Sequence, residues 1–492
     1  MNSRQLHLLS AGYLLLPNLV FFYYWFNTIV ACIAIPLLLL VYAYQVRTLP
    51  IGQSIRRKDV SIVAAFALFI TLISGVSGLC HQTFDYWAHN TKHYDLFVHD
   101  WPLKMPERGP NVSYYFGYYV VPGLVSKITH QLSESAIFIW TYVGFFLGLF
   151  WIYLILNRKI VLVLLALTIG DTAHVLKTFF AKFSVHFYDY QDFGVEIWSN
   201  FENLLWVPNQ SIPSFIMAGM LVFALKYRQD VEDSFFAIVL SFWWAVFPAL
   251  TMSLLMAIMV IRNFILSHYR RNWFTFILKL VVPALIVLPA LFYFSSHQQV
   301  PISGFIWTFR EDHVNTFKEF ATNIGLNLLL FFLARRYLRQ YSQLLPDYLF
   351  NTILVLILFF SLYRMGKVND FLFRGPMPYL IVIGSYLLEP LSNLIKPIRI
   401  VKEVPGKSQF ITICLLLVFS SCFIAIGRII RAVRVNQLTA YYFPKNVAFT
   451  PVPYNAYPNT YLVLKERWTL REANQYLGKS DSIYEQYLAS KK

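Results

Sequence analysis

The sequence predicts an all-α fold, a polytopic bundle of transmembrane helices, and three observations predict it. Of the 492 residues, 57% are hydrophobic and only 13% are charged, whereas about 25% of the residues in a soluble domain are charged. The mean hydropathy is +0.52. Apolar stretches of about 20 residues, the length that crosses a bilayer as a helix, recur along the chain. We therefore expect a multi-pass protein of the cell inner membrane.

The charge distribution argues against a nucleic-acid partner. The formal net charge is +16, but the basic residues lie in short clusters between apolar stretches and form no separate basic domain. Such clusters are typical of cytoplasmic loops that face anionic lipid headgroups. The four cysteines show neither metal-type spacing nor a disulfide framework. The first apolar stretch lacks a small-residue cleavage site, so it does not resemble a signal peptide.

The length rule and the positions of Lys and Arg predict about thirteen spans, with the N-terminus cytoplasmic and the C-terminus outside. The predicted spans are residues 8–26, 29–46, 60–79, 136–156, 160–176, 212–225, 235–250, 253–265, 274–294, 320–333, 349–363, 379–391 and 410–426. The first two form a hairpin that turns at Asn27. The pair 235–250 and 253–265 depends on Pro248, which fits either a turn or a kink. The bundle would end at residue 427, with outer loops 80–134, 178–210, 295–315 and 364–378.

The first outer loop gathers more ionisable side chains than any other part of this weakly charged chain. Asp85 lies about six residues past a span, where partial burial would move its pKa toward the working pH of a general base. Asp95 is the alternative base. Lys92, with His89 and His93, would bind phosphate or other parts of a substrate. The competing interpretation is a solvated loop whose Trp and Tyr side chains form an interfacial belt.

A metal site is the less favoured interpretation of Asp171 and His174. These residues end the fifth predicted span and share a helix face at a spacing of three. Carboxylate and imidazole at this spacing are a common helix-end pair, so we assign no metal ligands. A divalent metal stays an open alternative.

The second outer loop combines amides and indoles with a broken helix. Pro208 and Pro213 interrupt helical hydrogen bonding near the membrane boundary, where the freed backbone groups must find partners or line a cavity. Amides beside indoles suit sugar hydroxyls, although an interfacial amphipathic helix is an equal alternative. The candidate substrate-binding residues are Glu196, Trp198, Trp206, Asn209 and Gln210.

The fourth outer loop carries basic residues on the side where they are unusual. Arg374 and Lys367 run against the positive-inside tendency, and a guanidinium is a natural ligand for a lipid-linked phosphate. Asp370 is a candidate substrate-binding residue, or else the partner of Arg374 in an internal ion pair. The C-terminal tail, residues 428–492, is rich in Pro and Tyr and then helical in pattern. We expect it to lie on the outer loops as a lid or strap.

These features together resemble the GT-C class of membrane glycosyltransferases, which use polyprenyl-phosphate-linked sugars on the outer face. The segments FDYWAHNTKHYDL, YYFGYYVVPGLVSK, EIWSNFENLLWVPNQSIP and NDFLFRGPMP also resemble an uncharacterised bacterial membrane-protein family of this general type. The resemblance implies that Asp85 occupies the catalytic position and that Arg374 binds the lipid phosphate. In the GT-C class the acid follows the first span, whereas here it follows the third, so the 8–46 hairpin would be an addition.

The sequence therefore predicts a glycosyltransferase that needs no protein-bound cofactor and whose partners are membrane lipid and a polyprenyl-linked substrate. Protein partners are left open. Asp85 and Arg374 should line one outer cavity on the order of 7–15 Å apart, on opposite sides of the reacting carbon. Without donor, Arg374 should pair with Asp370 or Glu196. A transporter or flippase is the alternative, although it would need ionisable residues in mid-membrane. A scaffold of the cell envelope is a third possibility.

Overall fold

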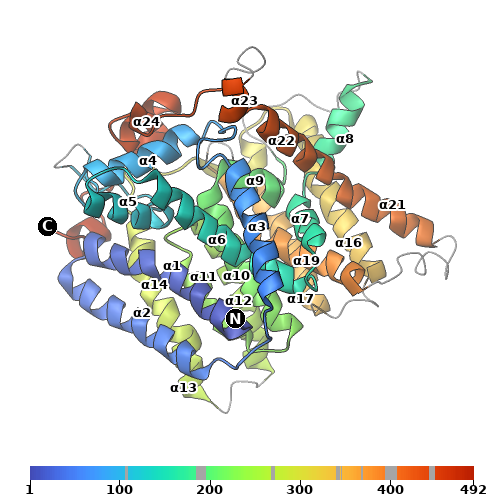
Figure 1. Cartoon of the computed structure of the whole chain (residues 1–492), viewed down its shortest axis with the longest axis horizontal. Coiled ribbons are helices and arrows are strands. Elements are labelled where there is room, and N and C mark those ends of the chain that lie inside the picture. The colour runs from blue at the N-terminus through green and yellow to red at the C-terminus, as the bar shows by residue number, and fades with distance from the viewer. Residues whose placement is uncertain are drawn as a thin grey trace.

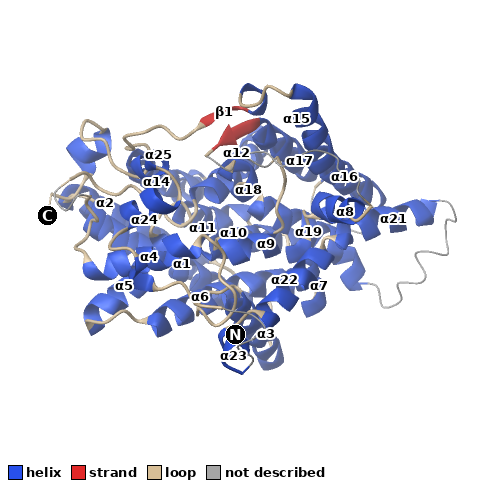
Figure 2. Cartoon of the chain, turned by 90° about the horizontal axis from the view of Figure 1, so that it is seen from above, coloured by secondary structure: helices blue, strands red, loops and turns tan. Residues whose placement is uncertain are grey.

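Helices form most of the chain, as Figures 1 and 2 show. The computed structural model describes residues 1–105, 109–183, 195–266, 272–338, 344, 346–366, 369–393, 407–442 and 449–491. Within these residues the two strands are β1 (Ser303–Phe305) and β2 (Tyr363–Met365). They pair antiparallel with Ser303 opposite Met365. The predicted helical, polytopic class is confirmed.

Nine helices of the described residues are long and apolar enough to cross a membrane. Five of them are single long helices: α1 (Ser3–Trp25), α2 (Thr28–Thr48), α6 (Glu134–Ile155), α10 (Pro208–Lys226) and α12 (Val246–Ile265). A sixth consists of α19 (Met377–Asn393) together with the short helix α18 (Asp370–Arg374) that precedes it. The other three are built from consecutive pieces: α13 (Trp273–Phe276) with α14 (Val282–Phe294), α15 (His313–Phe320) with α16 (Leu326–Leu338), and α21 (Lys407–Ser420) with α22 (Cys422–Arg434).

The remaining predicted spans correspond to shorter or bent helices, so the count of thirteen exceeds the nine that meet the length rule. These elements are α3 (Arg57–Ile73), α17 (Asp347–Leu362), α11 (Phe235–Leu240), and the pair α7 (Ile160–Thr168) and α8 (Thr172–Ala181), which bends by 70°. The predicted span 60–79 stops at Ile73 because Gly75 and Gly78 take φ values of +89° and +66°, which end the helix. Gly170, at φ +128°, lies at the bend between α7 and α8.

Pro248 marks neither a turn nor a kink. It lies in the first turn of α12, which begins at Val246. Backbone N–H groups there have no intrahelical partner, so proline removes no hydrogen bond. The predicted pair 235–250 and 253–265 is therefore wrong in its boundary: a six-residue α11 precedes one continuous helix of 20 residues.

The centre of the bundle is packed closely around α6 and α10. A Cβ added at Gly148 would lie 2.7 Å from the Phe215 Cβ, and one added at Gly219 would lie 2.5 Å from the Trp151 Cβ. Only glycine allows the two helices to approach this closely. The buried face of α10 leads directly to its N-terminal residues Asn209 and Gln210, so this packing fixes the base of the site described below.

The two ends of the bundle are distinct, and α1 connects them. At its start, the Ile55 N–H donates to the Met1 carbonyl; at its end, the Ser490 N–H donates to the Trp25 carbonyl. A helix of 23 residues rises about 35 Å, so the segments at Ile55 and Ser490, which contact its two ends, lie about that far apart. The predicted hairpin turn is confirmed, because the Asn27 side chain caps α2 by accepting from the Val30 N–H at 3.0 Å.

Segments predicted on the same side of the membrane meet in space. At the end near Met1, called the basic end, Arg158 donates to the Ser54 carbonyl at 2.9 Å and Lys226 donates to Asn157 at 2.7 Å. At the opposite end, called the cavity end, short bridges join predicted outer segments that are far apart in sequence. These bridges are Cys80–Asn436, Val112–Leu477 and His297–Gly478.

The C-terminal tail lies on the first outer loop, as the strap prediction states. That loop contains the helices α4 (Tyr86–Val98) and α5 (Gly117–Thr129). The tail contains α23 (Gln437–Tyr442), α24 (Thr460–Arg467) and α25 (Leu470–Asn474), and α24 packs against α4 (Figure 1). The Asn90 side chain donates to the Val452 carbonyl at 2.6 Å, and the Gln82 side chain accepts from the Val452 N–H at 2.7 Å. The helix α22 continues to Arg434, beyond the predicted start of the tail at residue 428.

Candidate functional site

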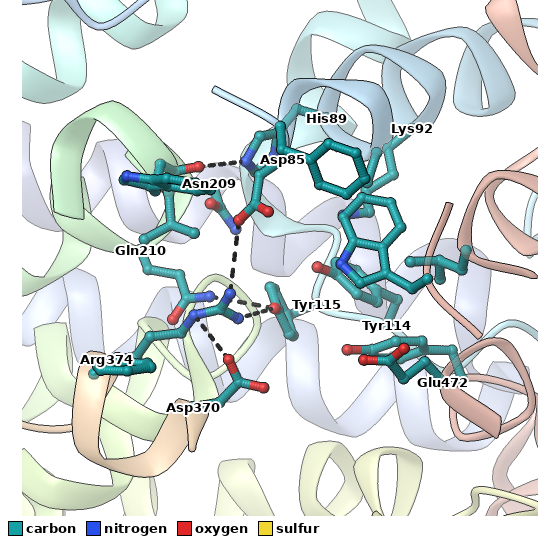
Figure 3. A pocket seen from close by; sticks show the side chains of 18 of the residues that line it. Asp85, His89, Lys92, Tyr114, Tyr115, Asn209, Gln210, Asp370, Arg374 and Glu472 are labelled. Carbon is teal, nitrogen blue, oxygen red and sulfur yellow. Dashed lines mark hydrogen bonds and ion pairs between the residues drawn. The ribbon is translucent and has the colours of Figure 1, made fainter. Parts of the chain in front are cut away.

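A cavity of about 350 Å³ opens at the cavity end, between α4, the short helix α9 (Asn200–Trp206), the start of α10, α18 and the tail helices. Figure 3 shows ten of its side chains from these separate elements converging on one space. Nine of the thirteen residues predicted from the sequence line it: Asp85, His89, Lys92, Trp198, Trp206, Asn209, Gln210, Asp370 and Arg374.

One face of α4 supplies the ionisable groups of the cavity. Asp85, at the N-cap position, is followed by Ala88, His89 and Lys92, and all four line the cavity. These positions are spaced i, i+3, i+4 and i+7, so they share one side of the helix. Seven residues rise about 10 Å along the helix axis, so Asp85 and Lys92 lie about two turns apart on this face.

Arg374 lies against two carboxylates. Its Nη2 is 3.8 Å from Asp85 Oδ2, its Nε is 3.3 Å from Asp370 Oδ1, and its Nη1 donates to the Tyr115 hydroxyl at 3.2 Å (Figure 3). The predicted pairing with Asp370 is confirmed, and the pairing with Glu196 is not. The predicted shared cavity is confirmed as well, but the separation on the order of 7–15 Å is wrong. The left-handed backbone at Asn369, φ +60°, begins α18 and turns Arg374 toward α4.

Asp85 has the environment of a carboxylate that can exchange a proton. Its side chain is 22% exposed. Partial burial raises the pKa of Asp85 above its usual value, while the positive charges of Arg374 and Lys92 lower it and the charge of Asp370 raises it again. The net effect is a pKa of Asp85 above its usual value, because the effect of burial exceeds that of the two cations.

Lys92 is a buried cation that faces aromatic rings. It is 2% exposed, and its Nζ lies 3.9 Å from the centroid of the Tyr114 ring and 5.4 Å from that of Tyr119. Burial lowers the pKa of Lys92 to about 7, although Asp85 raises it. An anion beside Nζ would offset the desolvation of the ammonium, so this end of the cavity is suited to a phosphate.

His89 is held in one tautomer. Its Nε2 lies 2.8 Å from the Trp206 carbonyl, which can only accept, so Nε2 carries the proton. Its Nδ1 therefore accepts from the Tyr119 hydroxyl at 2.5 Å. Burial and the charge of Lys92 lower the pKa of His89 well below its usual value. The imidazole is therefore neutral, with its one proton on Nε2, and both hydrogen bonds fix it in the wall of the cavity.

Two amide side chains at the start of α10 have polar atoms without a hydrogen-bond partner among the described residues. Both polar atoms of Asn209 and the Oε1 of Gln210 are buried without a hydrogen bond, and each residue is 1% exposed. Gln210 uses its Nε2 to donate to the Tyr115 hydroxyl at 3.2 Å. Buried polar atoms without partners are rare in folded proteins, so these amides are available to ligand hydroxyl groups.

Indole and phenyl rings form one wall, as predicted for Trp198 and Trp206. Their centroids lie 5.6 Å apart, and Trp198 stacks on Phe373 at 4.7 Å. The Trp206 Nε1 donates to Glu202 at 3.1 Å, which holds that indole in place. Sugar rings pack against such aromatic faces through their C–H groups while the hydroxyls reach polar neighbours.

Three predicted site residues, Asp95, His93 and Glu196, lie outside the cavity lining. Asp95 is fully buried and its carboxylate accepts from the Thr460 N–H at 2.7 Å and from His99 at 2.8 Å. His93 packs between the rings of Tyr118 and Tyr119.

Helical spacing alone does not exclude His93 and Asp95 from the cavity, because His93 follows His89 by four residues and Asp95 follows Lys92 by three. The neighbouring elements decide: Tyr118 and Tyr119 cover His93, and the tail covers Asp95 at Thr460. Glu196 lies 3.8 Å from Lys177 and accepts from the Trp198 Nε1 at 3.4 Å. Asp95 anchors the tail, so the alternative base is not supported. Lys367 lies outside the described residues.

Several lining residues were not predicted. Tyr114 and Tyr115 belong to the tyrosine-rich run after α4, whose hydroxyls and spacing were an available signal. Glu472 and Tyr476 come from the tail, and nothing in their local pattern indicated a site (Figure 3 labels Glu472). They reach the cavity only because α24 packs on α4.

The described residues contain no group of three or more His, Cys, Asp and Glu that could hold a metal ion. Asp171 is buried and accepts from the Ser199 N–H at 3.0 Å, whereas His174 is exposed, so the two do not form one site. No protein-family model, curated protein or solved structure matches the chain. Function is therefore inferred from the residues of the cavity.

Proposed function

We propose that this chain is a multi-pass membrane glycosyltransferase that moves a sugar from a polyprenyl-phosphate-linked donor to an acceptor on the outer face. One observation carries the proposal: a single helix face presents a carboxylate, Asp85, and a buried ammonium, Lys92, two helical turns apart in one cavity. The unpartnered amides of Asn209 and Gln210 border the same cavity. A base, an anion site and hydroxyl-binding groups thus surround a space of sugar width.

The size and lining of the cavity support a sugar ligand. Its volume of about 350 Å³ falls in the range of about 300–1,000 Å³ that small-molecule pockets occupy. Trp198 and Trp206 offer flat apolar faces, and the two amides offer donors and acceptors that a hydroxylated ring can satisfy.

The proposed step is one direct displacement at the anomeric carbon. Asp85 takes the proton from the acceptor hydroxyl or amine, and the acceptor atom forms a bond to that carbon. The bond from the anomeric carbon to the phosphate oxygen breaks, and its electron pair leaves with the lipid phosphate. Lys92 offsets the charge that develops on this leaving group. The configuration at the anomeric carbon is inverted.

Arg374 has a positioning role in this proposal. Because its guanidinium lies 3.8 Å from the Asp85 carboxylate, a phosphate bound there would sit beside the base and not across the sugar from it. We therefore assign the phosphate to Lys92. Arg374, shared between Asp85 and Asp370, holds the base toward the acceptor and favours its ionised form.

The outer location of the cavity is part of the same proposal. Basic residues such as Arg56, Arg57 and Arg158 lie at the end opposite the cavity. Loops of that composition are retained in the cytoplasm. With the N-terminus inside, the cavity and the C-terminal tail are outside, where lipid-linked sugars are used.

A transfer assay tests the proposal. The full chain in nanodiscs is given a panel of hexoses linked to polyprenyl phosphate together with a panel of hydroxyl and amine acceptors, and the release of polyprenyl phosphate is followed by mass spectrometry. Asp85→Asn should reduce release from the accepted donor by about 10²–10⁴-fold. Asp481→Asn is the matched control, because Asp481 is an exposed carboxylate paired with Lys479 on the surface.

The proposal is wrong if, for every donor in the panel, the wild-type protein releases polyprenyl phosphate no faster than the Asp85→Asn variant does. In that case the full chain is reconstituted in proteoliposomes, and the movement of fluorescent lipid-linked sugars between leaflets is measured. Accelerated movement without transfer would support the transporter or flippase alternative.

A further inference from the structure

A second cavity, of about 240 Å³, lies at the cavity end beside α22. Its ionisable groups come from His81, Glu202, Arg428 and Arg431. Phe84 and Trp206 line both this cavity and the first one, so the two spaces share a wall. The proposed sugar transfer uses none of the basic residues of the second cavity.

The cavity carries more positive than negative charge. Arg428 donates to both oxygens of Glu202, at 2.7 and 2.6 Å, so these two charges compensate each other. The side chain of Arg431, which is exposed, has no hydrogen bond or ion pair within the part of the chain that the structure describes. Burial, together with the charges of Arg431 and Arg428, lowers the pKa of His81, which leaves a neutral imidazole beside one uncompensated guanidinium.

The helix that carries these arginines faces outward. The span that ends in α22 is the least buried of the nine candidate spans in the described residues. Phe423, Ile426, Ile430 and Val433 are 66%, 47%, 52% and 62% exposed. Apolar side chains that are this exposed on a transmembrane helix face lipid tails. Arg428 and Arg431 lie within the same stretch of α22 but on another side of the helix, toward the second cavity.

A helix end alone does not account for this arrangement. Cations in a last helical turn interact favourably with the helix dipole, and Arg434, which lies outside the cavity lining, is explained in that way. Arg431 and Arg428 differ because they line a concave space together with His81. A guanidinium and an imidazole that converge beside lipid-facing side chains match an anion attached to an acyl chain.

We propose that the second cavity binds the phosphate headgroup of a membrane lipid from the leaflet at the cavity end. Arg431 and His81 contact the phosphate oxygens, Arg428 adds charge while it stays bound to Glu202, and the acyl chains follow the Phe423–Val433 face of α22. The site does not depend on sugar transfer, because Lys92 and Asp85 lie in the other cavity.

Native mass spectrometry of the full chain in detergent tests the site. The probe is dioctanoyl phosphatidic acid, compared with dioctanoylglycerol, which lacks the phosphate, and with inorganic phosphate as a competitor. Arg431→Gln should weaken the tightest binding event about tenfold, as expected for a charge-assisted hydrogen bond. Arg434→Gln, which removes the same charge three residues away, should change it less than twofold, and Lys92→Met should leave it unchanged.

Four results would overturn the proposal. Two concern affinity: Arg434→Gln weakens the binding of phosphatidic acid as much as Arg431→Gln does, or dioctanoylglycerol binds as tightly as phosphatidic acid. In the third, inorganic phosphate displaces the lipid when present at the same concentration as the lipid. In the fourth, the binding event is lost in Lys92→Met alone. The last result would place the lipid in the first cavity. If Arg431→Gln does not fold, His81→Leu replaces it. This substitution removes the imidazole but keeps a side chain of similar size, and it should also weaken the binding of phosphatidic acid selectively.

Discussion

The two ends of the bundle use charge differently. At the basic end, Arg158 lies 3.0 Å from Asp59 and Lys279 lies 2.8 Å from Asp233. In the first cavity, at the other end, Arg374 lies 3.8 Å from Asp85, and the Lys92 Nζ lies over tyrosine rings; the close Arg428–Glu202 pair of that end belongs to the second cavity. Close pairs of matched charges stabilise loops and helix ends, whereas loosely matched charges around a space are suited to a ligand.

The same contrast holds for uncharged amides. Asn18, in the core of α1, donates to the carbonyls of Leu14 and Leu240, both at 2.8 Å. Asn209, at the cavity, has no partner for either polar atom among the described residues. A buried polar atom left unpaired costs about 1–3 kcal/mol. Asn369, which lies outside the lining of the first cavity, also has two such atoms, so a missing partner indicates a binding residue only together with a position in the cavity, as for Asn209.

The largest effect is expected from a pair of aspartates, one at each end. Asp85→Asn should lower turnover by about 10²–10⁴-fold, because only the proton acceptor is lost, with little change in melting temperature. Asp59→Asn should do the reverse. It removes the charged partner of Arg158 and should lower the free energy of unfolding by about 1–3 kcal/mol, with normal turnover per folded molecule. If both variants lose activity in proportion to stability, the two ends do not differ in role.

The pH dependence of the reaction should report Lys92. Its pKa of about 7 in the empty cavity means that the ammonium, the form that binds phosphate, is lost as pH rises through 7. Thus kcat/KM should fall above about pH 7, and the limb for kcat should lie higher, because bound phosphate raises the pKa of Lys92. Lys92→Arg keeps its charge and should move the alkaline limb of kcat/KM upward. An unmoved limb would assign the titration to another group.

A smaller effect is expected from the two asparagines. Asn209→Leu should leave the free energy of unfolding unchanged or raised, because it removes unpaired buried atoms, while KM for the donor rises about tenfold. Asn18→Leu should lower the free energy of unfolding by about 1–2 kcal/mol, because it deprives the Leu240 carbonyl of its donor. Denaturant unfolding and donor titration measure both. Destabilisation by Asn209→Leu would mean that the amide holds the fold.

The smallest effect concerns the attachment of the tail. The Arg467 guanidinium lies 3.8 Å from the centroid of the Trp87 ring, and its Nε donates to the Tyr457 hydroxyl at 2.7 Å. Exposed contacts of this kind contribute about 0.5–1 kcal/mol. Arg467→Gln should therefore raise amide exchange in α24 about two- to fivefold without changing exchange in α1. No change in α24 would show that Asp95 and Thr460 hold the strap without help.

The sequence predicted the parts of the fold that depend on local pattern. The α1–α2 hairpin at Asn27 and the convergence of Asp85 with Arg374 were both anticipated. The early end of α3 was not, because a positive φ at Gly75 cannot be read from composition. Asp95 was misassigned because its role depends on Thr460, about 365 residues away in the chain. Glu472 was missed for the same reason: only tertiary packing brings it to the cavity.

The most direct test of sugar transfer is a cryo-EM structure of the full chain in nanodiscs with a polyprenyl phosphonate-linked hexose that cannot be cleaved. We predict that the phosphonate lies within hydrogen-bonding distance of the Lys92 Nζ, that the sugar contacts Asn209 and Trp206, and that the anomeric carbon faces Asp85. A phosphonate bound at any other place, including beside Arg431, with the first cavity empty, would contradict the proposed function.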